Sequence, residues 1–167
     1  MNLLIVFFSV AVFVGILALI AKARYRRVVR RIARRRPGAH VVLSYALPEL
    51  REAVARVSPA PRRPRWSTVA IVTVTAVSIE VWATRDLEPR CRVAREEATF
   101  SIEPVDMLSG TWTRRVEGLW IEGGSAELVL VPAPLSTLAV RRKRLRVEME
   151  RALDAFGCDP STVPGFA

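Results

Sequence analysis

The chain has 167 residues, with 26 Lys and Arg against 16 Asp and Glu, for a formal net charge of +10. This length fits one domain of ordinary size with an appendage, and a hydrophobic content of 51% excludes a disordered polyampholyte. Two Cys and one His exclude a disulfide scaffold, and they disfavour a conventional zinc site because such sites take four Cys or His ligands.

The first long feature is an apolar run of 19 residues over 3–21 that contains no charge. A helix of that length rises about 1.5 Å per residue and just crosses a hydrocarbon core of about 30 Å. We therefore interpret residues 1–21 as a transmembrane helix rather than a buried core helix, which rarely runs so long without a charge. A cleaved signal peptide is the closer alternative, but its small-x-small site would be Ala21-Lys22-Ala23, with a lysine inside it.

A strongly basic segment follows over residues 22–36. It contains nine basic residues: Lys22, Arg24, Arg26, Arg27, Arg30, Arg31, Arg34, Arg35 and Arg36. Positive flanks stay in the cytoplasm. The sequence therefore predicts an uncleaved single-pass anchor in the cell (inner or plasma) membrane, with the N-terminus outside and the rest of the chain in the cytoplasm. The charge is concentrated here, because residues 22–65 hold 14 basic and 2 acidic residues, whereas residues 66–167 hold 12 and 14.

The basic segment also has a helical period. Tyr25, Val28, Val29, Ile32 and Ala33 share one face and the arginines lie opposite, which predicts a juxtamembrane amphipathic helix that stops at Pro37-Gly38. Three roles compete for it. We favour a topology determinant in which the nine basic residues contact anionic lipids of the inner leaflet. A partner-docking helix is the second role. Nucleic-acid binding is the third, and we expect no nucleic-acid partner because no aromatic interleaving or nucleic-acid fold supports one.

Residues 37–65 are interpreted as a linker with a short helix that begins at Pro48 and ends in a proline-rich stretch. From residue 66 the pattern becomes β-like. Residues 68–83 are dense in Val, Ile and Thr, and strands are favoured over a second membrane span because four Ser or Thr and Glu80 lie within them.

Further strands are predicted over 90–95, 98–103 and 110–114, followed by a hairpin over 118–131 that turns at Gly123-Gly124. Residues 138–156 are predicted to form an amphipathic helix that ends at Gly157, and 158–167 form a tail. The expected fold class is α+β or mainly β: a small antiparallel β-barrel or sandwich over residues 66–157, capped by the C-terminal helix.

This order of elements resembles bacterial pleckstrin-homology-like domains over residues 68–157. The resemblance is carried by Val-Ser-Ile-Glu-Val-Trp82, Ala-Thr-Phe-Ser-Ile-Glu103 and Gly-Leu-Trp-Ile-Glu-Gly-Gly124, followed by the helix. The chain is also similar to small single-span proteins of high-G+C Gram-positive bacteria that carry such a domain. The resemblance implies a binding or scaffolding module, in some members one for phosphoinositide headgroups. We expect no such specificity here, because acidic residues alternate with the arginines in the matching region, 85–97.

No catalytic set is evident: the chain lacks a phosphate-binding Gly-rich loop, a Gly-x-Ser-x-Gly motif and a Cys-x-x-Cys motif. We expect no enzyme, no cofactor, no metal and no small-molecule substrate. The sequence favours a membrane-tethered module that recruits or positions a protein partner, with Trp82, Trp112 or Trp120 contributing where exposed. Direct reading of anionic lipid by the basic segment is the alternative, as is a role as a small accessory subunit of a larger membrane complex.

Overall fold

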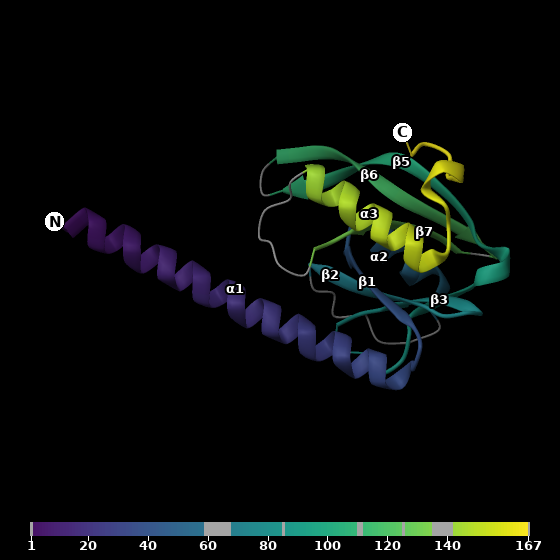
Figure 1. The fold of residues 1–167 in the computed structure, drawn as a ribbon, viewed down its shortest axis with the longest axis horizontal. Helices are drawn as coiled ribbons and strands as arrows, with labels where there is room; N and C mark the ends of the chain where they lie inside the picture. Colours follow the sequence, from purple (N-terminus) through teal and green to yellow (C-terminus); the bar gives the residue numbers. More distant parts are fainter. Residues whose placement is uncertain are drawn as a thin grey trace.

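One long helix, α1 (Asn2–Arg35), leads into a β-rich unit that packs beside its C-terminal end (Figure 1). The computed structural model describes residues 2–58, 68–84, 86–109, 112–124, 126–134 and 142–166. Two further α-helices, α2 (Pro48–Val57) and α3 (Arg142–Phe156), pack with the sheet. Short 3₁₀ helices occupy Arg95–Glu97 and Pro160–Thr162. The fold class is α+β.

Seven antiparallel strands form one sheet in the order β4-β3-β2-β1-β7-β6-β5. The strands are β1 (His40–Tyr45), β2 (Val69–Val74), β3 (Ser78–Trp82), β4 (Cys91–Ala94), β5 (Thr99–Ser109), β6 (Trp112–Gly123) and β7 (Ala126–Pro132). The sheet is not closed, because β4 and β5 are its two edges. The expectation of a barrel or sandwich is therefore met only at the coarser level of an antiparallel sheet with helices.

A short junction between β1 and β7 joins the two halves of the sheet. Only two residue pairs connect these strands, Ser44↔Pro132 and Tyr45↔Val131. The buried hydroxyl of Ser44 accepts a hydrogen bond of 3.1 Å from the Val131 N–H and donates one to the Tyr45 carbonyl. A side chain thus supplements the two backbone pairs that join the halves of the sheet.

The helix α1 runs without a break through the apolar and the basic parts of the sequence. It ends at Arg35 because Pro37 lacks an N–H group and disfavours a helical conformation in the residue before it. Gly38 then turns the chain with a φ of +78°, a conformation that glycine adopts without strain. The chain enters β1 two residues later.

Both faces of β2 are covered, so all six of its residues are buried. On one face, Val72 and Val74 belong to the main core, which includes residues of α2 and α3. On the other face, Ile71 packs with Trp82 of β3 and with Ile32 of α1. The C-terminal part of α1 therefore serves as an outer layer of the folded unit.

The described structure assigns a different role to much of the segment that was interpreted as a linker over 37–65. His40–Tyr45 forms β1, which lies between β2 and β7 in the middle of the sheet. The helix α2 does begin at Pro48, and it buries Leu50, Ala53 and Val54 in the main core. Sequence reasoning missed the role of β1. Its six residues alternate only weakly between apolar and polar, and such a pattern does not indicate which strands it pairs with.

The remaining expected elements lie close to their predicted places. Residues 68–83 form the hairpin of β2 and β3, as strands rather than a membrane span. The strand expected over 98–103 extends to Ser109 as β5, and the one expected over 110–114 begins at Trp112 as β6, with 110 and 111 outside the described residues. The hairpin at Gly123-Gly124 pairs Gly123 with Ala126. The described part of the C-terminal helix begins at Arg142.

Candidate functional site at the junction of α1 and the sheet

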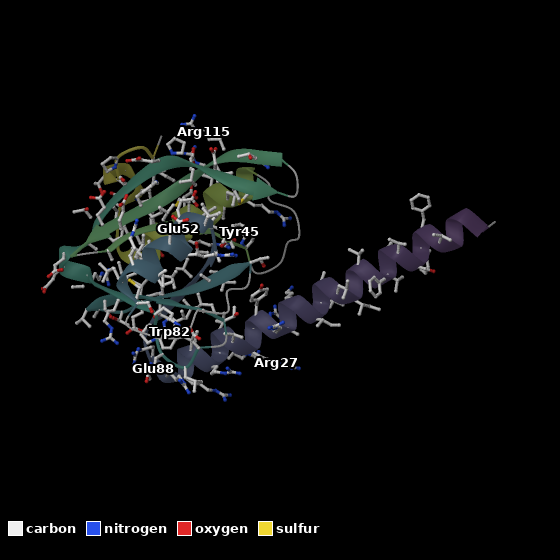
Figure 2. The ribbon with its side chains drawn as sticks, turned by 180° about the vertical axis from the view of Figure 1, so that it is seen from behind. Arg27, Tyr45, Glu52, Trp82, Glu88 and Arg115 are labelled. Atoms are coloured by element: carbon white, nitrogen blue, oxygen red, sulfur yellow. The ribbon has the colours of Figure 1, made fainter. Side chains whose placement is uncertain are left out.

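The apolar face of α1 packs onto the outer face of the sheet. Val28 and Ile32 are buried there with Leu43, Ile71 and Trp82, and Tyr25 and Val29 pack at the margin. The hydroxyl of Tyr25 lies 3.3 Å from that of Thr68, at the start of β2. Figure 2 shows Trp82 beside the C-terminal end of α1. Because this face is covered by protein, it is not available to lie in the headgroup layer.

The structure separates the nine predicted basic residues into two groups. Arg24, Arg26, Arg27, Arg30, Arg31 and Arg34 are exposed, and Lys22 is half-buried. No ion pair with a carboxylate forms at these seven residues within the described part of the chain. Arg35 and Arg36, in contrast, contact the folded unit. Arg35 is exposed but donates a hydrogen bond to the Leu87 carbonyl.

Arg36 pairs with Glu80, a carboxylate on β3 that is only 1% exposed. The Arg36 Nε donates to Glu80 Oε2 at 2.8 Å, and its Nη2 donates to Oε1 at 3.1 Å. The Arg36 guanidinium also lies 5.7 Å from the centre of the Trp82 ring, within the range of a cation–π contact. This bidentate pair fixes the end of α1 to the sheet.

Two further side chains complete the surroundings of Glu80. Arg92, on β4, approaches Oε1 at 2.8 Å through Nη2 and at 3.0 Å through Nε. The Thr73 hydroxyl, on β2, donates to Oε2 at 3.2 Å and accepts a hydrogen bond from Trp82 Nε1 at 3.0 Å. The carboxylate is therefore held by residues from the end of α1 and from two neighbouring strands, β2 and β4, which satisfies the requirement that a buried charge be paired and hydrogen-bonded.

The two arginines keep Glu80 ionised. Burial by itself raises the pKa of Glu80, but the hydrogen bonds and charge of Arg36, followed by those of Arg92, outweigh that effect and lower the pKa overall. The same hydrogen bonds raise the pKa of Arg36. Sequence reasoning missed this cluster, although one signal was present: an acidic residue inside a Val- and Ile-rich strand requires a cationic partner.

A groove of about 1130 Å³ opens beside the edge strand β4, at the end of α1. Val77 and Leu87 line it and are 75% and 59% exposed. Among the described residues after α1, the only other exposed large apolar side chain is Val147. Gly123, near the end of β6, also lines the groove. It lies so close to β4 that a Cβ added to it would be 2.4 Å from the Val93 side chain. Two exposed apolar residues, Val77 and Leu87, therefore accompany this edge of the sheet, together with charged residues such as Arg92 and Glu97.

The three tryptophans named from the sequence do not form one surface. Trp82 is 1% exposed and belongs to the α1 interface. Trp120 is half-buried and packs against an apolar cluster that includes Val129 and Val131. The side chain of Trp112 lies outside the described residues. The exposed positions that sequence reasoning missed are Val77 and Leu87, both at turns.

The described residues contain no group of three His, Cys, Asp or Glu that could hold a metal ion. Burial raises the pKa of the Cys91 thiol to about 11, so this thiol is protonated at neutral pH. Comparisons of the chain with protein-family models, with curated proteins and with solved structures gave no match.

Proposed function

We propose that this chain is a single-pass membrane protein that presents a cytoplasmic, pleckstrin-homology-like module for recruiting or positioning a protein partner. The observation that carries the proposal is the division of α1. The described apolar side chains of its N-terminal part are exposed, with Phe8 at 72%, whereas its C-terminal part packs on the sheet. One helix in the described structure is long and apolar enough to span a membrane. An exposed apolar run of this length supports a place in the hydrocarbon core of a bilayer.

The proposed orientation of the chain in the membrane rests on the basic residues that follow the apolar run. Seven basic residues directly after the apolar run lie on α1 without a carboxylate partner in the described structure. Such flanks stay in the cytoplasm during insertion. The seven-stranded antiparallel sheet with the helix α3 packed in its core supports the pleckstrin-homology-like interpretation. The groove beside β4 supports a protein partner, because an exposed strand edge flanked by apolar side chains suits an extended peptide.

Direct reading of anionic lipid is a second candidate, favoured by the exposed arginines of α1. Because α1 is continuous, only some of these arginines can lie close to the headgroups. Arg34 lies thirteen residues after Ala21, or about 20 Å along the axis, whereas electrostatic attraction fades over about 8 Å at physiological salt. Lys22, Arg24 and Arg26 therefore face the headgroups, and the later arginines face the cytoplasm. The role of accessory subunit of a larger complex is a variant of the first proposal.

Photo-crosslinking in native membranes tests the proposed function. A photo-reactive residue at Val77 or Leu87 is expected to crosslink one reproducible protein, whereas the same residue at Asp154, which is exposed on α3, is not. A reporter that is active only in the cytoplasm, fused after Ala167, is expected to be active. Crosslinking at Asp154 equal to that at Val77 would contradict the partner surface, and an inactive reporter paired with an active extracytoplasmic one would contradict the orientation.

A further inference from the structure

The two edge strands of the sheet, β4 and β5, differ in how their outer edges are covered. On β5, the Ile102 N–H donates a hydrogen bond of 2.8 Å to the Pro164 carbonyl, so the segment around Pro164 pairs with this edge. Gly165 fits there because an added Cβ would collide with the Ile102 carbonyl oxygen. Pro104, the next residue of β5 whose backbone faces outward, has no N–H group. This part of the β5 edge is therefore protected against pairing with another chain.

The backbone of β4 faces the groove without such protection. The Arg95 N–H, just after β4, donates toward β3, to the Val77 carbonyl at 3.0 Å. Because ladder bonds alternate in direction along an antiparallel strand, the N–H and C=O groups of Arg92 and Ala94 point the other way, into the groove. In the described structure no strand pairs with them.

The groove extends over both faces of the sheet at β4. On the core side its lining residues are small or apolar: Val57, Gly123 and Ala126. On the outer side it is lined by Arg36, Trp82 and Arg92. Side chains along a strand alternate between the two faces of a sheet. A strand added to β4 would therefore place every second side chain among apolar residues and the others among arginines.

The outer side of the groove carries an excess of positive charge. Arg36 and Arg92 share the carboxylate of Glu80, so these three residues together have one net positive charge. Exposed Arg35 adds a second, because it contacts the carbonyl oxygen of Leu87 and not a carboxylate. A carboxylate that faces Arg92 from an added strand is therefore attracted, and an ammonium group is repelled. The acidic lining residues flank β4 and do not lie on it: Glu88 and Glu97.

We propose that β4 binds an extended segment of the protein partner as an additional strand, in which apolar and acidic residues alternate. The inference rests on the proposed function, since it specifies the chemistry of the partner recruited at the groove. Main-chain hydrogen bonds with Arg92 and Ala94 hold the segment, and the alternate side chains give specificity. Because β4 spans only Cys91–Ala94, the side-chain contacts decide which segments bind.

Two peptides of identical composition and charge test the alternation. Val-Glu-Val-Glu-Val-Glu-Val alternates, whereas Val-Val-Glu-Glu-Val-Val-Glu does not, and the exposed arginines of α1 attract both equally. Each peptide carries a fluorescent dye, and its binding to the full chain in micelles of a neutral detergent is followed by anisotropy, with empty micelles as the blank. We expect the alternating peptide to bind several-fold more tightly. Equal binding of the two peptides overturns the proposal.

The variant Ala94→Pro tests the backbone pairing. Proline at this position removes an N–H that points away from β3 and keeps the preceding residue extended, so the ladder with β3 is retained. Asp106→Pro is the matched control, because Asp106 is exposed on β5 and its N–H faces outward as that of Ile102 does. After the unfolding midpoints are compared, the preference for the alternating peptide should disappear in Ala94→Pro and persist in Asp106→Pro. A preference that survives in a folded Ala94→Pro chain contradicts strand addition.

Amide hydrogen exchange of the natural chain gives the same test without a variant. Saturating alternating peptide should slow exchange at Arg92 and Ala94 several-fold and leave Asp106 unchanged. Unchanged exchange at Arg92 and Ala94 overturns the inference. A photo-reactive residue at Val77 in native membranes separates this inference from the proposed function. A crosslinked protein that is retained in Ala94→Pro leaves the proposed function standing and overturns strand addition, whereas the absence of any crosslinked protein in the natural sequence overturns the proposed function.

Discussion

Glu80 places a negative charge inside a fully buried strand, and three side chains from other elements bind its carboxylate: Arg36, Arg92 and Thr73. Arg36 supplies two hydrogen bonds, and Arg92 supplies one hydrogen bond and a second ion-pair contact. The side chain of Arg36 is 34% exposed and that of Arg92 is 58% exposed. The Arg36 pair is therefore less screened by water, and we expect it to contribute more to stability.

The first prediction concerns Arg36→Gln. This change leaves a buried carboxylate with a single cation, and it should lower the free energy of unfolding by about 1–3 kcal/mol. Chemical unfolding of the full chain in detergent micelles, followed by tryptophan fluorescence, measures the loss. Arg34→Gln is the control, since Arg34 is exposed, lies two residues before Arg36 and should change stability by no more than about 0.5 kcal/mol. Equal losses in the two variants would show that the pair with Glu80 contributes nothing.

The pH dependence of stability gives a second prediction. Glu80 has a pKa below its ordinary value of 4.5 in the folded chain, so its charge stabilises the fold above that value. The contribution is lost as the pH falls through the lowered pKa of the folded state. Stability curves of the natural chain and of Glu80→Gln should therefore be furthest apart near neutral pH and should converge below pH 4.5. A difference that stays constant down to strong acid would contradict this.

At the scale of elements, β1 is the strand on which the sheet depends. It pairs with β2 over six residues and with β7 over two, and it connects the half of the sheet that carries β4 with the half that carries β5. A fragment of residues 66–167 lacks both β1 and α2. It should fail to fold, because Ile71, Val131 and the main core lose the neighbours that cover them.

A fragment of residues 22–167 is the matched control for that prediction. It omits the apolar run but keeps the part of α1 that packs on the sheet, so we expect a soluble protein with one cooperative unfolding transition. Circular dichroism and thermal unfolding distinguish the two fragments. A cooperative transition of residues 66–167 at the same temperature would mean that β1 and the end of α1 are dispensable.

The elements that sequence reasoning located well are those with strong local signals. The basic helix ends before Pro37, and the β6–β7 hairpin turns at Gly123-Gly124. The sequence could not place β1 in the sheet, because pairing between residues 44 and 132 is a property of the tertiary fold. It could not pair Arg36 with Glu80 either, since 44 residues separate them and only the packing of α1 on β3 brings them together. The exposure of Val77 and Leu87 could not be predicted either, because it depends on how the strands pair and pack in the tertiary fold.

At the scale of the whole molecule, α1 is both the proposed anchor and a layer of the folded unit. A flexible tether would let the sheet turn freely above the bilayer, whereas a continuous helix fixed by Ile32, Arg36 and Trp82 does not. The position of the β4 groove relative to the membrane is then a consequence of helix geometry. A partner that binds there is held at a defined distance from the surface, which raises its effective concentration for membrane targets.

The last prediction tests this rigidity. Inserting Gly-Gly-Ser between Ala23 and Arg24 interrupts α1 after the apolar run but before Tyr25, where packing on the sheet begins. The unfolding midpoint of the sheet should stay unchanged, because none of the packed residues is altered. Pulsed electron–electron spin resonance between labels at Val6→Cys and Glu122→Cys, in a Cys158→Ser background, should give a narrow distance distribution in the natural sequence and a broad one after the insertion, since two glycines remove the helical constraint. A distribution that is already broad without the insertion would mean that the anchor and the sheet move independently, and the fixed height of the groove above the membrane would then have no structural basis.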